Sequence, residues 1–193
     1  MRSICMESGK ILFTTAETDD IAVPNSIPTA EGAISLAIKN SAETINGSRT
    51  LIVGYGRVGQ ALACRMKALG SEVEIVNRGE LLREKAVQDG YTVLIWQGFI
   101  KKLGTYDYIF NTVPALVLPA SALGFVRKGS LLMELASAPG GIDMKAALEM
   151  GLNVIQASGL PGKFSPVSAG KILAAAYPRF IDDFMREAGD ANE

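Results

Sequence analysis

The chain has 193 residues, 48% of them apolar, with 19 basic and 20 acidic side chains and a formal net charge of −1. This suits one domain with a substantial core and gives no general attraction to nucleic acid or to an anionic membrane. There is no histidine, and two cysteines, Cys5 and Cys64, do not make a disulfide framework or a metal site. No apolar run approaches the ~20 residues of a membrane span, and no signal peptide is recognisable, so we expect a cytoplasmic protein.

The chain before Thr29 is weakly patterned. Residues 11–14 fit a short strand, and Pro24 and Pro28 predict turns or extended chain. Thr29 is a good N-cap, and apolar residues recur at helical spacing after it. The pattern therefore predicts a helix over 29–40.

Apolar runs alternate with helical stretches from Arg49 onward. The runs expected as strands are TLIV, EVEIV, TVLIW, YIFNTV, LLMEL and NVIQA. Nearly continuous apolar strands, each followed by a helix, predict a parallel sheet covered on both faces. With right-handed crossovers, this gives a Rossmann-type doubly wound sheet, a three-layer α/β/α fold with strand order 3-2-1-4-5-6. A last helix is expected over 166–187, with Pro178 as a place for a kink.

A glycine motif separates the first of these strands from its helix. Its residues are Gly54, Tyr55, Gly56, Arg57, Val58 and Gly59, which fit G-x-G-x-x-G. In this context the first glycine permits a sharp turn, the second allows a pyrophosphate to approach, and the third allows close packing of helix on strand. The helix N-terminus would then face the phosphates. The alternative is a βαβ turn without a ligand.

The second strand ends at Asn77 and Arg78, about 20 residues past the glycines. A site selective for NAD usually has an acid there to hold the ribose 2′-hydroxyl, whereas Glu74 should lie within the strand. An amide and a guanidinium suit a 2′-phosphate instead, and the guanidinium can also stack on adenine. We therefore expect NADP rather than NAD; the alternative is that Arg78 is an ordinary solvated side chain.

Three later loops also follow predicted strands. Residues 111–115 (NTVPA) lie where the nicotinamide side of a cofactor would pass, so Thr112, Val113 and Pro114 are predicted cofactor contacts. Residues 136–141 and 158–162 are rich in glycine and proline and can present N–H groups to an anion. Short connections without a ligand are the alternative. Glu134, inside a buried strand, needs hydrogen-bond partners, and a structural role is favoured.

Five segments together resemble the A-subunit of dipicolinate synthase from spore-forming bacteria. They are NSIPTAEGAI, VGYGRVG, NTVPA, ELASAPGGID and GLPGKFSPVSAG, and the resemblance extends from about residue 20 to residue 177. It implies a Rossmann-fold oxidoreductase that oxidises dihydrodipicolinate to pyridine-2,6-dicarboxylate with NADP. It also implies a partner, the B-subunit of dipicolinate synthase, and the mother-cell cytoplasm of a sporulating bacterium.

The resemblance further implies a substrate site for a small dicarboxylate. The residues expected to border it are Thr29, Glu31, Ala138, Pro139, Gly140, Gly141, Gly159, Leu160, Pro161 and Gly162. Lys163 and Arg57 are cations placed to meet an anion. Without histidine, a general base would be Asp, Glu, Lys, Tyr or water, and no residue is assigned to that role.

Members of this family carry a further N-terminal domain before the NSIPT segment. We therefore expect residues 1–28 to be an extension left from that domain and 29–188 to form the NADP-binding domain. Two other functions stay open: an NADP-binding module without catalysis, and a shikimate-dehydrogenase-like reductase, which Val76-Asn77-Arg78 also suggests. Apolar area on the helices at 29–40 and 166–187 would favour self-association.

Overall fold

The computed structural model describes residues 18–190, so the strand expected at residues 11–14 lies outside the described part. The described helices are α2 (Asp19–Asn40), α3 (Arg57–Ala68), α4 (Glu80–Gln88), α5 (Ala120–Leu123), α6 (Met144–Glu149), α7 (Leu160–Phe164), α8 (Pro166–Asp190) and the 3-10 helix η1 (Phe99–Thr105). The strands are β1 (Arg49–Val53), β2 (Glu72–Val76), β3 (Thr92–Leu94), β4 (Tyr108–Asn111), β5 (Leu131–Glu134) and β6 (Asn153–Gln156).

All six strands are parallel and lie in the order β3-β2-β1-β4-β5-β6, which confirms the predicted topology. The register aligns their last residues in one row. These residues are Leu94, Val76, Val53, Asn111, Glu134 and Gln156. We call this row the carboxyl edge. In open α/β sheets ligands bind beyond this edge, so the register decides which loops can share a ligand.

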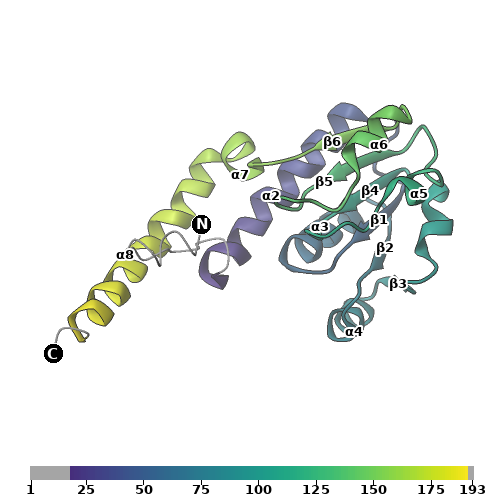
Figure 1. Ribbon diagram of the computed structural model, residues 1–193. Helices are drawn as coiled ribbons and strands as arrows, with labels where there is room; N and C mark the ends of the chain where they lie inside the picture. The colour runs from purple at the N-terminus through teal and green to yellow at the C-terminus, as the bar shows by residue number, and fades with distance from the viewer. Residues whose placement is uncertain (1–17, 191–193) are drawn as a thin grey trace.

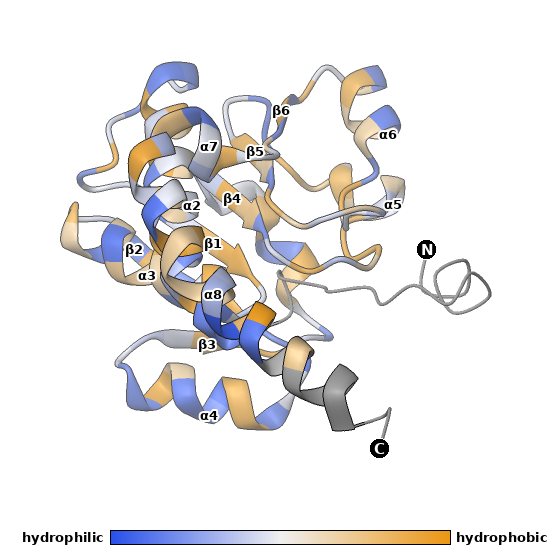
Figure 2. Cartoon of the chain, turned by 90° about the vertical axis from the view of Figure 1, so that its left-hand side faces the viewer, coloured by the Kyte–Doolittle hydropathy of each residue, from blue (hydrophilic) through white to orange (hydrophobic). Residues whose placement is uncertain are grey.

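Helices cover both faces of the sheet, as the alternation of buried side chains requires. Ile52 and Phe110 point into a core closed by α2, α3, α4 and α7. Leu51 and Ile109 point into a second core closed by η1, α5 and α6. Figure 1 shows these layers, and Figure 2 shows hydrophobic β1 inside them while α4 alternates between polar and apolar residues. The three-layer α/β/α class is therefore confirmed.

Helix α2 corrects the prediction for the first part of the chain. It begins at Asp19, ten residues before the predicted start, and runs through Pro24 and Pro28 to Asn40. Each proline removes a backbone N–H donor and costs about 3 kcal/mol in a helix interior. Packing outweighs this cost, since Pro28 is buried and α2 contacts α3, α7 and α8. The predicted boundary between 28 and 29 thus falls inside one helix.

Thr29 is accordingly not the N-cap that the sequence suggests. Its Oγ1 donates to the Asn25 carbonyl at 2.7 Å, the backward bond typical of a helix interior. Ser26 Oγ similarly donates to the Val23 carbonyl at 2.6 Å. These bonds accompany two prolines that a sequence pattern presents as helix breakers.

Two other boundaries differ from the predictions. The run TVLIW forms a strand only over Thr92–Leu94, and Ile95 is 75% exposed beyond its end. At the other end of the chain, α8 begins at Pro166 as predicted but continues to Asp190. Figure 1 shows α8 extending from the body beside the first turns of α2, where Arg179 and Asp20 approach to 3.7 Å.

Candidate functional site

The carboxyl edge gathers the loops in which the sequence pattern places a cofactor. The glycine turn follows β1 at residues 54–56, and residues 77–79 follow β2. Residues 112–119 follow β4, 135–143 follow β5, and 157–159 follow β6. Because the strand ends are in register, the loops start side by side.

Each glycine of the turn has a distinct steric reason. Gly54 has φ +97° and donates its N–H to the Val76 carbonyl at 2.8 Å. A Cβ on Gly54 would lie 2.4 Å from Thr112 Oγ1, and one on Gly59 would lie 2.2 Å from the Gly54 oxygen. A Cβ on Gly56 would meet no atom within 4 Å. Gly54 and Gly59 therefore allow the close packing, while Gly56 leaves backbone open to a ligand.

Helix α3 begins at this turn in a form that suits an anion. Its N-cap is Gly56, with no side-chain cap and no acidic residue in the first turn. The first N–H groups of a helix have no carbonyl partner within it, and the helix dipole adds positive potential there. Arg57 forms an ion pair with Asp19, which brings the start of α2 to the same place. The start of α3 thus fits a pyrophosphate, as predicted.

Tyr55 contributes to the turn rather than to an open surface. Its N–H donates to Asn77 Oδ1 at 3.1 Å, and its side chain is only 1% exposed. Its hydroxyl donates to Asp89 Oδ2 at 2.7 Å. Burial and this bond raise the pKa of Tyr55 above its usual value, while the same bond lowers the pKa of Asp89. Tyr55 therefore anchors the turn to α4.

Asn77 joins the loops after β1 and β2. It is buried, and while Oδ1 accepts from Tyr55, its Nδ2 donates to the Gly79 carbonyl at 3.0 Å. The sequence pattern suggests that Asn77 contacts a 2′-phosphate. In the structure its amide is engaged by two backbone groups, so its role in shaping the loops is direct.

No acid ends β2. Glu74 lies within the strand, as expected, where it accepts from the Tyr106 hydroxyl and approaches Arg49 Nη2 at 3.3 Å. Burial and the hydrogen bond to Glu74 raise the pKa of Tyr106. The residues that do follow β2 are Asn77 and the exposed Arg78. This end of the strand offers a cation, not a carboxylate, to an adenosine ribose.

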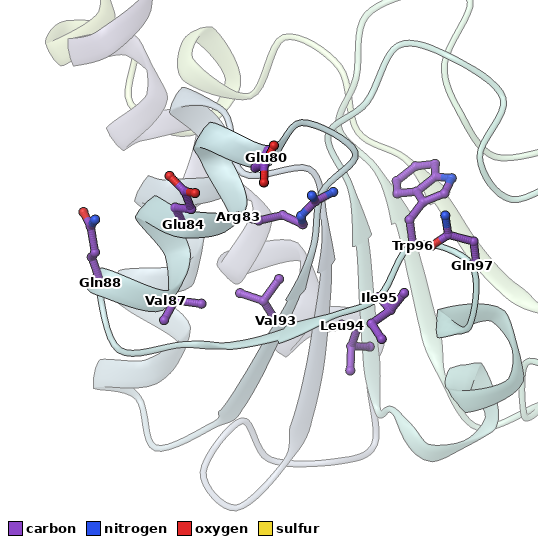
Figure 3. Close-up of a pocket in the computed structure, with 10 residues that line it drawn as sticks. All are labelled: Glu80, Arg83, Glu84, Val87, Gln88, Val93, Leu94, Ile95, Trp96 and Gln97. Atoms are coloured by element: carbon purple, nitrogen blue, oxygen red, sulfur yellow. The ribbon is translucent and has the colours of Figure 1, made fainter.

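Arg78 has two neighbours that the sequence pattern does not single out. Its guanidinium carbon lies 5.6 Å from the centre of the Trp96 ring, and Arg83 Nη1 donates to its carbonyl at 2.8 Å. Arg83 and Trp96 also line a groove of about 630 Å³ between α4 and β3. Figure 3 shows Arg83 reaching from α4 toward Trp96.

The loop after β4 packs directly on the glycine turn. Thr112 donates from both its N–H and its Oγ1 to the Val53 carbonyl, at 2.9 and 3.0 Å. Asn111 closes the loop on itself through both the N–H and the carbonyl of Val113. Pro114 is exposed at the loop surface. The structure therefore brings the three predicted cofactor residues of this loop next to the glycines.

Glu134 has the structural role that the sequence favours. It is 1% exposed, and its carboxylate accepts four hydrogen bonds. The donors are Asn111 Nδ2 at 2.7 Å and the N–H groups of Ala136, Gly141 and Ile142 at 2.9, 2.7 and 2.8 Å. Four donors satisfy a buried ionised carboxylate without a cation. Glu134 thereby links the loops after β4 and β5.

Glu134 also shapes the predicted substrate segment at 138–141. The peptide bond between Ala138 and Pro139 is cis, and Gly140 has φ +80°. A Cβ on Gly141 would lie 2.5 Å from Asn111 Nδ2. Ala138 and Pro139 are exposed at the loop surface.

The other predicted substrate segment forms α7 and its entry. Gly159 has φ +64° and precedes the helix as its N-cap. Leu160 is buried against α2, where a Cβ on Gly32 would lie 3.0 Å from it, while Gly162 is exposed. Lys163 is exposed beside them. Leu160 thus packs in the core, and the rest of the segment stays accessible.

Thr29 and Glu31 lie inside α2 rather than in a loop. Glu31 Oε1 lies 3.4 Å from Arg65 Nε, in the last turn of α3 and so at the far end of that helix from the glycine turn. Their assignment to substrate remains a prediction. Within residues 18–190, no group of His, Cys, Asp or Glu side chains could hold a metal ion, and no helix could span a membrane.

Comparisons with known proteins agree with this architecture. Residues 29–130 match the model of the D-isomer specific 2-hydroxyacid dehydrogenase, NAD binding domain. The chain is 33% identical to the dipicolinate synthase A-subunit of Bacillus subtilis over 189 residues, which cover 98% of this chain and 64% of that protein. The chain therefore spans less than two thirds of this relative.

Solved structures give the same result. The dipicolinate synthase A-subunit from Bacillus halodurans superposes with a TM-score of 0.88 at 35% identity, over 93% of this chain and 62% of that one. Its Bacillus subtilis counterpart superposes with a TM-score of 0.89 at 33% identity, over 96% and 62%. The chain thus belongs to the family of D-isomer specific 2-hydroxyacid dehydrogenase NAD-binding domains, and its resemblance to the dipicolinate synthase A-subunit is confirmed.

Proposed function

We propose that this chain is the NADP-binding part of an oxidoreductase that oxidises dihydrodipicolinate to dipicolinate (pyridine-2,6-dicarboxylate). The observation that carries the cofactor preference is the end of β2, where exposed Arg78 follows the strand and no carboxylate takes the ribose position. The similarity to the dipicolinate synthase A-subunit supports the substrate. Oxidation to an aromatic ring removes a hydride and a proton from ring carbons, and bound NADP would accept the hydride.

Within this proposal the residues of the chain bind and orient. The N–H groups at the start of α3 hold the pyrophosphate, and Arg78 holds the 2′-phosphate. Thr112, Val113 and Pro114 lie along the cofactor on its way to the substrate. The segments at 138–141 and 159–162 border the dicarboxylate, with Lys163 as a nearby cation. Glu134 positions two of these loops through four hydrogen bonds.

A turnover assay tests the proposal. Purified protein is mixed with dihydrodipicolinate and NADP, and the absorbance of reduced nicotinamide is followed. Reduced cofactor is measured rather than dipicolinate, because a dihydropyridine can aromatise in air without reducing NADP. We expect enzyme-dependent formation of NADPH, faster than formation of NADH from NAD. Absence of NADPH formation, with or without the B-subunit of dipicolinate synthase, would contradict the proposed activity.

A non-catalytic NADP-binding module is the second candidate. Two observations favour it, because two side chains that could act as a base at the carboxyl edge are engaged in the fold. Glu134 accepts from donors at both carboxylate oxygens, and the Tyr55 hydroxyl donates to Asp89. NADP binding without turnover, even with the B-subunit present, would support this function instead. A shikimate-dehydrogenase-like reductase is tested in the same assay with 3-dehydroshikimate and NADPH.

The proposed partners follow from the relative. The relative is named as one subunit of a synthase, which motivates a partner, here proposed to be the B-subunit of dipicolinate synthase in the mother-cell cytoplasm of a sporulating bacterium. Self-association is also proposed, because α8 exposes Val167, Tyr177, Ile181 and Met185 at 70, 42, 60 and 64%. Sedimentation of the purified chain over a range of concentrations tests this, and a monomer at all concentrations would contradict it.

A further inference from the structure

Trp96 lies between the core and the exposed Arg78. Its ring centre is 5.5 Å from that of Phe99, and Phe99 is only 2% exposed in the core beneath η1. Its ring also has the Arg78 guanidinium carbon 5.6 Å from its centre, within range of a cation–π contact. A buried ring thus orients the indole, and the indole orients the cation.

A second cation belongs to the same cluster. Arg83 on α4 donates to the Arg78 carbonyl at 2.8 Å, which ties it to the turn after β2. Both Arg83 and Trp96 line the groove between α4 and β3 (Figure 3). The two guanidinium groups and the indole therefore meet at the end of the groove nearest the carboxyl edge.

We propose that Trp96 is a positioning residue for NADP selectivity, holding Arg78 where a 2′-phosphate of adenosine arrives, with Arg83 as the second cation. This inference rests on the proposed function. An arginine face that lies on an indole leaves its N–H groups pointing outward in the plane of the guanidinium, free to donate to phosphate oxygens. An unsupported exposed arginine must instead lose side-chain entropy when it binds.

The test compares two ligands that differ only in the 2′-phosphate. They are adenosine 2′,5′-bisphosphate and adenosine 5′-monophosphate, with dissociation constants measured by calorimetry. For Trp96→Ala we expect the preference for the bisphosphate to fall by about threefold to fivefold, the size of an exposed cation–π contact. Trp96→Phe keeps an aromatic face and should lose less than about twofold. The ratio itself corrects for general damage to the site.

A matched control removes one positive charge elsewhere. Lys128 is exposed in the turn before β5, at the end of the sheet opposite the carboxyl edge. Lys128→Ala should leave the ratio unchanged, because charges beyond about 10 Å are screened at 0.1 M salt. Arg83→Ala should lower the ratio and so separates local from overall charge.

The unmodified protein offers a second measurement, since Trp96 is the one tryptophan in the sequence. We expect the bisphosphate to change the tryptophan emission more than the monophosphate does at equal saturation. This readout does not depend on whether Trp96→Ala folds. Binding of the bisphosphate without any change in emission would overturn the inference.

The outcomes separate this inference from the proposed cofactor. A wild-type preference for the bisphosphate that Trp96→Ala leaves intact would overturn the role of Trp96 alone. Equal affinity of the wild-type protein for both ligands would overturn the NADP preference, and the inference with it. A fall in the ratio for Trp96→Ala, with Trp96→Phe and Lys128→Ala near wild type, supports the inference.

Discussion

Asn77 shows how one side chain can connect two loops of a binding site. It links the glycine turn to the turn after β2 through Tyr55 and Gly79. Its type and place alone suggest a phosphate contact, because an amide can donate to phosphate. A sequence does not reveal, however, that backbone groups already engage this amide.

Replacement of Asn77 by alanine separates these two roles. Loss of the link should loosen the turn that both cofactors share, so we expect NADP and NAD to bind about tenfold more weakly, in line with loss of two buried hydrogen bonds. Calorimetry with both nucleotides measures this. A loss confined to NADP would show instead that Asn77 contacts the 2′-phosphate.

The Tyr55–Asp89 bond predicts a dependence of stability on pH. The hydrogen bonds from Tyr55 and then Lys85 lower the pKa of Asp89. A lowered pKa means that this stabilisation is present above the unfolded value of about 3.9 and is lost as the pH falls through the folded value. Tyr55→Phe removes the larger cause. We therefore expect its deficit in urea stability relative to wild type to be larger at pH 7 than at pH 3; equal deficits would contradict this.

Glu134 predicts a stability effect at one atom. Glu134→Gln puts an amide donor where four N–H groups converge, so at least one buried donor loses its acceptor. We expect a loss of about 3 kcal/mol in the free energy of unfolding, measured in urea. Glu149→Gln, at an exposed pair with Lys145, should change it by less than about 1 kcal/mol. Similar losses for the two variants would contradict the role given to Glu134.

At the scale of elements, the strands and their order were predictable, while the ends of several elements were not. Continuous apolar runs identify strands buried on both faces, and the glycine turn locates the first crossover. Pro24 and Pro28 misplaced the start of α2, because local propensity does not include its packing against α3, α7 and α8. Similarly, Ile95 and Trp96 continue an apolar run but lie beyond β3.

The candidate site was predictable to the same degree. The loops of the carboxyl edge follow from the strand order, so the glycines and residues 112–114 were found. Arg83 and Trp96 were missed, since their approach to Arg78 depends on how α4 and the end of β3 lie in space. The sequence did offer one signal: Arg83 follows Arg78 at near-helical spacing.

The glycine turn predicts opposite effects at two positions. Gly54→Ala should destabilise the fold, because φ is +97° and the added Cβ would meet Thr112 Oγ1 at 2.4 Å. Gly56→Ala should fold normally, since its Cβ meets no atom within 4 Å, yet bind NADP at least about tenfold more weakly if a pyrophosphate lies there. Thermal melting and calorimetry measure the two effects. Unchanged NADP binding by Gly56→Ala would place the pyrophosphate elsewhere.

At the scale of the whole molecule, one register organises the site. Six parallel strands end in a row, so loops from five of them meet at the carboxyl edge. Helices α2 and α8 lie together beside the layered body, with α8 extending away from it (Figure 1). The molecule thus offers a nucleotide-binding edge at the sheet and a separate pair of helices whose apolar surface is partly exposed.

The central claim is that the carboxyl edge binds NADP with its 2′-phosphate at Arg78. Calorimetric titration of wild-type protein and of Arg78→Ala with NADP and NAD tests it most directly. We expect wild type to prefer NADP, and Arg78→Ala to bind NADP about tenfold to a hundredfold more weakly, as for loss of charged hydrogen bonds, with little change for NAD. Equal losses for both nucleotides, or no heat with either one for wild type, would contradict the account.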